Sequence, residues 1–188
     1  MINLLPTPKI CRENEGKRIT LSPSITSERN ALSQHIPAFS KIFEKLFKIK
    51  LGEGKDGFTL VYDASLPSDT YVIDTEEAFI IRASAKEGLM YGLASALQLV
   101  SVKEGVIFAP SLYIEDKPDK EYRSLMLDLS REWHTIEQIL KFVDLCFLYK
   151  INYLHLHYPL LNFELSMHIS DLREILSHKR PVHLLRKT

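Results

Sequence analysis

The sequence has no excess of charge of either sign and few cysteines, and each of these features argues against a class of protein. Lys plus Arg and Asp plus Glu both number 24, so the formal net charge at pH 7 is zero. Balanced charge argues against a surface for nucleic acid or an anionic membrane. The only cysteines, Cys11 and Cys146, are far apart and fit no metal-ligand spacing. Two cysteines do not make a disulfide framework, which favours a reducing compartment.

Long hydrophobic runs are also missing. No segment reaches the ~20 apolar residues that a membrane-spanning helix needs. The amino-terminal segment MINLLPTPKI has no basic residues before its short apolar run, and Pro6 and Pro8 interrupt it. It therefore lacks the pattern of a signal peptide. Together these features predict a cytoplasmic protein.

What the chain does contain is ordinary for a globular protein. Its 188 residues are 45% hydrophobic and 26% charged, which supplies enough apolar material for a core. This length fits one large domain, or one small domain and a piece of another.

The first part of the chain predicts an α+β domain over residues 1–115. Apolar residues spaced by three and four predict a helix over 27–50, with Pro37 ending a first short helix or kinking a longer one. A second helix is predicted over 86–101, where Gly88 and Gly92 allow close packing on a sheet. The strands are expected at 17–22, 58–64, 71–76 and 78–85, the last two as a hairpin. This order predicts an antiparallel sheet with two helices.

A different pattern begins after residues 110–122, a polar stretch with two prolines that predicts a linker. The apolar segments SLMLDLS and INYLHLH flank an amphipathic helix over 136–150. Thr135 and Gln138 have the spacing of a capping box at its start. Two apolar strands joined by a helix predict a right-handed βαβ unit. We therefore expect a second domain over 119–188.

Several segments resemble the β-N-acetylhexosaminidases of glycoside hydrolase family 20. The matching pieces cover about residues 1–157 in the family's order, and the most specific are YRSLMLDLSR and LYKINYLHLH. The others are LLPTPKI, AFIIRASAKEGLMYGLASALQLV and IEDKPDKEYRSLMLDLSRE. The resemblance implies a small α+β domain followed by the first strands of a (β/α)8 barrel.

The same resemblance implies an activity. Family members remove terminal β-linked N-acetylglucosamine or N-acetylgalactosamine from glycans, which are the expected partners, and no cofactor is expected. The acetamido oxygen of the sugar attacks the anomeric carbon, an Asp orients that group, and a neighbouring Glu protonates the leaving oxygen.

The substrate-binding residues implied by the resemblance are Arg123, Asp128 and His157. Arg123 would bind sugar hydroxyls through its planar guanidinium, with a salt bridge as the alternative. Asp128 and Arg131 match a motif at the pocket rim, and an ion pair between them is equally consistent with the sequence. His155 and His157 alternate onto one face of their strand. They would be hydrogen-bonded barrel residues or pocket residues, and a metal site would need a third ligand.

The resemblance ends after His157. Residues 158–188 do not match the family, and none of the 188 residues matches its catalytic Asp–Glu pair; Asp171 and Glu174 lie in a segment predicted to be an ordinary helix. This loss favours a frameshift followed by an early stop, and thus a truncated barrel. We expect a chain without its general acid that is inactive alone. The alternative is a non-catalytic remnant, or a module that binds carbohydrate or a protein partner.

Overall fold

The structure is a computed structural model, and it describes residues 3–28, 30–129, 131–132, 134–158 and 163–168. The chain forms two compact units. The first contains Met1–Glu121 together with Leu148–Lys150, and the second contains Tyr122–Phe147 and the described residues from Ile151 on. The described part contains no helix that is both long and apolar enough to cross a membrane.

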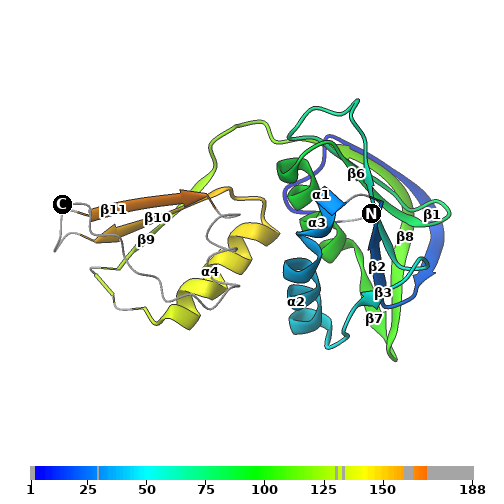
Figure 1. Cartoon of the computed structure of the whole chain (residues 1–188), viewed down its shortest axis with the longest axis horizontal. Coiled ribbons are helices and arrows are strands. Elements are labelled where there is room, and N and C mark those ends of the chain that lie inside the picture. The colour runs from blue at the N-terminus through cyan, green and yellow to red at the C-terminus, as the bar shows by residue number, and fades with distance from the viewer. Residues whose placement is uncertain (1–2, 29, 130, 133, 159–162, 169–188) are drawn as a thin grey trace. The chain divides into compact units, whose positions relative to one another are not determined.

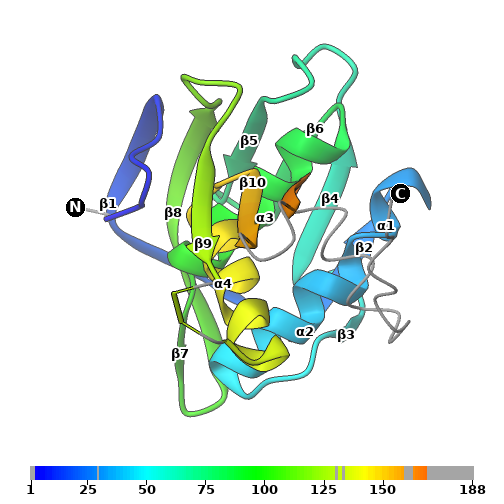
Figure 2. The same ribbon diagram turned by 90° about the vertical axis from the view of Figure 1, so that its left-hand side faces the viewer.

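The first unit is built on an eight-stranded sheet in the order β1-β8-β5-β6-β4-β2-β3, with β7 also paired to β8 (Figure 2). The strands are β1 (Ile10–Leu21), β2 (Ser24–Ser27), β3 (Gly52–Glu53), β4 (Phe58–Tyr62), β5 (Tyr71–Asp74), β6 (Phe79–Ala83), β7 (Ser101–Lys103) and β8 (Val106–Asp116).

The sheet is mixed, which corrects the prediction of an antiparallel sheet. The predicted hairpin of β5 and β6 is antiparallel, but β4 runs parallel to both β6 and β2, and β3 runs parallel to β2. A parallel pair requires a long crossover between its strands. The helices between β2 and β4 make one such crossover, and the prediction did not include β2.

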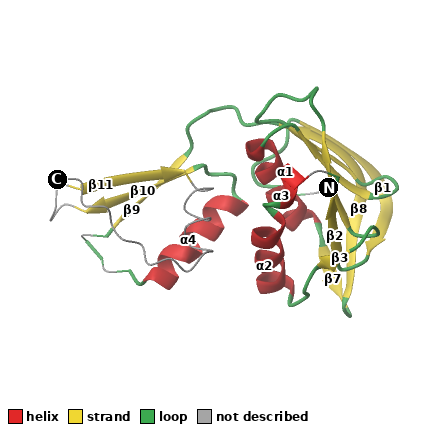
Figure 3. Ribbon diagram, viewed as in Figure 1, coloured by secondary structure: helices red, strands yellow, loops and turns green. Residues whose placement is uncertain are grey.

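Three helices lie against one face of this sheet (Figures 1 and 3). They are α1 (Asn30–Ser33), α2 (Ile36–Phe47) and α3 (Lys86–Leu99). The helix predicted over 27–50 is therefore two helices, because Pro37 stands in the first turn of α2. Proline is well tolerated there, where its missing N–H would have no helical partner. Phe39 and Phe43 of α2 pack edge-on against Phe58 of β4, at ring centroid distances of 5.5 and 5.6 Å.

Helix α3 packs closely on β5 and β6, as its small residues predicted. A Cβ atom on Gly92 would lie 2.7 Å from Cγ2 of Ile81, and one on Gly88 would lie 2.2 Å from the carbonyl oxygen of Thr70. Leu93, on the same helix, has no exposed surface. The glycines therefore serve packing.

The predicted linker over 110–122 is wrong for most of its length. Val106–Asp116 is strand β8, which pairs with β1 on one side and β5 on the other. Pro110 is accommodated at the β-bulge of β1, where the register shifts between Glu13 and Arg18. A proline lacks an N–H and is tolerated in a sheet at such bulges. Residues 117–121 follow β8 and lead to the second unit, which begins at Tyr122.

The first unit contains a buried polar network that joins Lys150 to Asp116, Tyr71 and Ser95. The Lys150 ammonium lies 2.9 Å from Oδ2 of Asp116 and 2.6 Å from the Tyr71 hydroxyl. That hydroxyl donates to Asp116 Oδ2 at 2.8 Å and lies 2.7 Å from the Ser95 hydroxyl. Only 6% of the Lys150 side chain and 8% of the Asp116 side chain are exposed. Burial and the Asp116 carboxylate raise the pKa of Tyr71, so the phenol stays protonated.

The second unit contains β9 (Ser124–Asp128), α4 (Ile136–Leu148), β10 (Tyr153–Tyr158) and β11 (Phe163–His168). β9 and β10 are parallel and are joined by α4, as the predicted βαβ unit requires. The capping box is confirmed: the Thr135 N–H donates to Gln138 Oε1 at 2.7 Å, and the Gln138 N–H donates to Thr135 Oγ1 at 3.3 Å.

Strand β11 was not predicted. It pairs antiparallel with β10, so the second sheet has the order β11-β10-β9. Asp171 and Glu174, and the helix predicted around them, lie outside the described residues.

Candidate functional site

Two of the three predicted binding residues meet at one edge of the second unit. Asp128 is the last residue of β9, and His157 is its direct partner in β10. Adjacent strands lie about 4.8 Å apart, so the two residues are immediate neighbours. Strand alternation puts Ser124, Met126 and Asp128 on one face of β9, and their partners Tyr153, His155 and His157 lie on the same face of β10. The carboxyl ends of two parallel strands thus bring a carboxylate and an imidazole together.

Backbone contacts hold this edge in place. The N–H of Leu129 donates to the carbonyl oxygen of His157 at 3.1 Å, which extends the pairing one residue past β9. The opposite faces of the strands carry Leu127 and Leu154, which are 8% and 0% exposed. Because these leucines are buried, the alternation of the strand fixes which side Asp128 faces.

Arg131 joins Asp128 at the same edge. Its backbone N–H donates to Asp128 Oδ1 at 3.3 Å, and its Nε lies 3.5 Å from Asp128 Oδ2. The ion pair that the sequence left open is therefore present. The Arg131 side chain is 89% exposed and that of Asp128 is 25% exposed. A pair this exposed adds only about 0–1 kcal/mol to stability. Because little free energy holds Arg131 in this contact and its side chain is exposed, a ligand can reach its guanidinium.

Arg123 lies at the opposite end of the strand. It directly precedes β9, five residues before Asp128, and a strand rises about 3.3 Å per residue, so about 16 Å separates them. Its backbone N–H donates to Asn152 Oδ1 at 2.9 Å, and its carbonyl oxygen accepts the N–H groups of Asn152 and Tyr153. The three residues predicted to bind one sugar therefore do not share one edge.

His155 lies on the same face as His157, two residues earlier, and pairs with Met126. Met126 is 61% exposed. Within the described residues, no group of three or more His, Cys, Asp or Glu side chains is arranged to hold a metal ion.

The carboxyl edge therefore offers hydrogen bonds of both kinds. The Asp128 carboxylate only accepts them, the Arg131 guanidinium only donates them, and a neutral His157 ring can do either. A sugar hydroxyl both donates and accepts, so this set is suited to a polyhydroxylated ligand. In parallel α/β barrels the active site lies at the carboxyl ends of the strands.

Comparison with known proteins gives this arrangement a family. The sequence model described as "Glycosyl hydrolase family 20, domain 2" matches residues 1–117, well over half of the chain. The chain belongs to glycosyl hydrolase family 20. The model of the family 20 catalytic domain matches residues 121–159, which include Asp128 and His157.

Individual family 20 relatives agree with this assignment. A β-hexosaminidase of Vibrio vulnificus is 32% identical over 158 residues, which are 82% of this chain and 18% of that protein. One from Akkermansia muciniphila is 36% identical over 98 residues, 50% of this chain and 19% of the relative. The chain thus spans only about a fifth of the length of these two relatives.

Solved structures show the same fold. A family 20 exo-β-N-acetylglucosaminidase of Vibrio harveyi superposes with a TM-score of 0.76 at 24% identity, covering 82% of this chain and 25% of that one. A β-N-acetylhexosaminidase of Bacteroides fragilis gives a TM-score of 0.68 at 26% identity, with 82% and 32% covered. An N-terminal domain followed by the start of a barrel is compatible with these neighbours.

Proposed function

We propose that the second unit binds a terminal N-acetylhexosamine of a glycan at the carboxyl edge of β9 and β10. The observation that carries the proposal is the direct pairing of Asp128 with His157 at that edge, within the segment matched by the family 20 catalytic domain. The names of the relatives, β-hexosaminidase and β-N-acetylglucosaminidase, support the choice of sugar.

The proposal assigns roles by geometry. Asp128 accepts hydrogen bonds from sugar hydroxyls, and Arg131, which it orients through the contact of 3.5 Å, donates to a neighbouring sugar oxygen. His157 fixes the sugar from the adjacent strand. Arg123 lies at the far end of β9, so we assign the role predicted for it to Arg131.

We further propose that these 188 residues bind the sugar without hydrolysing it. The family mechanism needs an Asp to orient the acetamido group and a Glu to protonate the leaving oxygen, and no segment of this sequence matches that pair. A general acid is usually worth ~10²–10⁴ in rate. The alternative, a carbohydrate-binding module with no part in catalysis, uses the same edge.

The site is tested by measuring the binding of N-acetylglucosamine to the 188-residue chain with isothermal titration calorimetry. Asp128→Asn and His157→Gln should each weaken binding about ten-fold. The first removes the charged acceptor of the site, and the second removes the imidazole ring that holds the sugar from β10. Arg123→Gln is the matched control and should leave the affinity unchanged. Equal losses in all three variants, or no binding by the parent chain, would reject the carboxyl edge as the site.

A further inference from the structure

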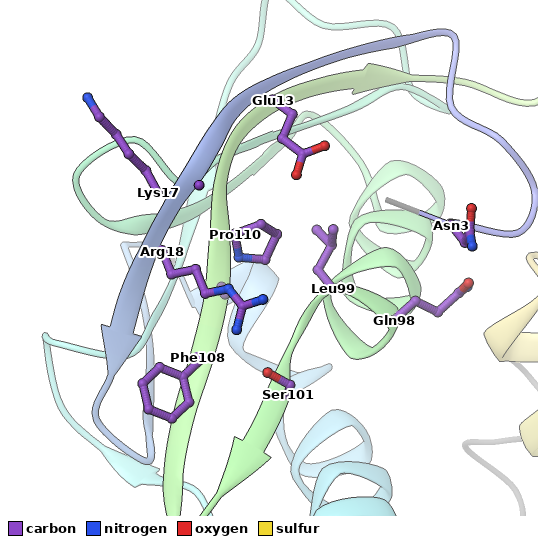
Figure 4. Close-up of a pocket in the computed structure, with 11 residues that line it drawn as sticks. Asn3, Glu13, Lys17, Arg18, Gln98, Leu99, Ser101, Phe108 and Pro110 are labelled. Atoms are coloured by element: carbon purple, nitrogen blue, oxygen red, sulfur yellow. The ribbon is translucent and has the colours of Figure 1, made fainter. Parts of the chain in front are cut away.

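The first unit carries a groove that neither the family assignment nor the proposed site explains. It lies between the bulged strand β1, strand β8 and the carboxyl-terminal end of α3, and its volume is about 370 Å³ (Figure 4). This is near the lower end of the 300–1,000 Å³ typical of small-ligand pockets. The groove is thus large enough for a ligand about the size of one sugar.

The β1 bulge shapes one wall. Four residues, Asn14 to Lys17, stand between the paired positions Glu13 and Arg18, and the register shifts there. The Asn14 side-chain amide donates to the Ser111 hydroxyl at 3.1 Å and ties the bulge to β8. Gly16 has a φ of +76°, a conformation that glycine adopts without strain. The wall is therefore a defined feature of the backbone.

The groove presents one acidic and one basic group. Figure 4 shows the Glu13 carboxylate and the Arg18 guanidinium directed toward the groove, whereas the Lys17 side chain points away from it. Ser101 contributes a hydroxyl from the start of β7. Glu13 would repel an anion and Arg18 would repel a cation, so the pair favours a neutral ligand. A carboxylate accepts hydrogen bonds and a guanidinium donates them, so hydroxyl groups on such a ligand can bind both.

Apolar groups complete the lining. The Pro110 ring and the Leu99 side chain face the same space, and Leu99 is only 7% exposed. The C–H face of a pyranose ring can pack on these groups while its hydroxyls reach Glu13, Arg18 and Ser101.

We propose that this groove is a second carbohydrate site, which binds one neutral sugar residue of a glycan. The choice of an N-acetylhexosamine as its probe rests on the proposed function, but the preference for a neutral sugar rests on the groove alone. About 15 non-hydrogen atoms at the efficiency of ordinary ligands give a dissociation constant on the order of 1 mM. Such a weak site would add to binding chiefly by holding a glycan at two points.

The test is a ¹⁵N–¹H correlation titration of the full 188-residue chain with methyl N-acetyl-β-D-glucosaminide. We expect saturable shifts of the amides of Glu13, Arg18 and Ser101. Arg18→Gln should weaken binding at these amides about ten-fold, since it removes a charged donor. The matched control is Arg12→Gln on the same strand, whose guanidinium lies over the Tyr113 ring at 5.8 Å, and it should change nothing.

Three outcomes would overturn the inference. One is the absence of saturable shifts at the groove up to 50 mM sugar, about fifty times the expected dissociation constant. Another is an equal response in the Arg18→Gln and parent chains, with both spectra well dispersed. The third is displacement of the sugar by inorganic phosphate, which would mark an anion site. Shifts confined to Asp128 and His157 would reject the groove and leave the proposed function intact, and the reverse pattern would do the opposite.

Discussion

Replacing Lys150 with methionine should strongly destabilise the first unit. The substitution keeps a similar length and volume but removes the ammonium that lies 2.9 Å from Asp116 Oδ2 and 2.6 Å from the Tyr71 hydroxyl. The Asp116 side chain is 8% exposed, so water cannot replace the lost charge. Removing one partner of a buried pair costs about 3–5 kcal/mol. For a unit of this size, at about 4 °C per kcal/mol, the melting temperature should fall by roughly 12–20 °C.

The assay is a thermal melt followed by circular dichroism, with a double-mutant cycle. Lys150→Met combined with Asp116→Asn removes both charges, so it should destabilise by clearly less than the sum of the two single changes. Lys9→Met is the control, because the ion pair of Lys9 with Asp119 lies on the surface, and it should leave the melting temperature unchanged. A fall of less than 3 °C for Lys150→Met, or additive single effects, would refute the reasoning.

Further predictions concern the core and the thiols. Leu93→Asp should unfold the first unit, because a side chain with no exposed surface becomes a buried unpaired charge, whereas Leu46→Asp, at a position 51% exposed, should not; equal melting curves for these two variants would contradict this. A thiol reagent should modify the exposed Cys11 in the native chain and the buried Cys146 only after denaturation; two fast thiols would show that α4 is not packed. Burial raises the pKa of Cys146 to about 11, so the folded state holds that proton more tightly and stability should fall as the pH rises from about 9 to 11; Cys146→Ala should flatten this dependence in melts across that range.

Features set by neighbouring residues could be predicted from the sequence. The capping box of Thr135 and Gln138 involves two residues three apart and is confirmed by both hydrogen bonds. The break in the first helical region at Pro37 is local in the same way. The βαβ unit was also predicted, because two apolar segments flank an amphipathic helix.

Features set by distant partners could not be predicted. Pro110 suggested a linker, but the bulge in β1 that accommodates it is about ninety residues away in the chain. The buried pair of Asp116 and Lys150 joins residues 34 apart, and nothing in either local sequence marks them as partners. For β11 a signal was present, since Phe163, Leu165 and Met167 alternate with polar residues, which is typical of a strand.

The geometry of the candidate site likewise depends on how distant strands pair. A strand offers its residues to two ends, and the motif from Arg123 to Asp128 spans the whole of β9. The sequence pattern therefore did not show that Arg123 and Asp128 lie at opposite ends of β9, and the binding roles of these residues stay predictions. Pairing of Asp128 with His157 became evident only from the parallel register of β9 and β10.

The most direct test of the central claim is a hydrolysis assay with 4-nitrophenyl N-acetyl-β-D-glucosaminide. The 188-residue chain should be produced in a host that lacks its own hexosaminidases, and assayed at a sugar concentration that saturates the carboxyl edge in calorimetry. The account predicts binding that depends on Asp128 and His157, with release of nitrophenol equal to that of buffer alone. Turnover that copurifies with the chain and falls in the Asp128→Asn variant would contradict it, because these residues would then supply a complete catalytic site.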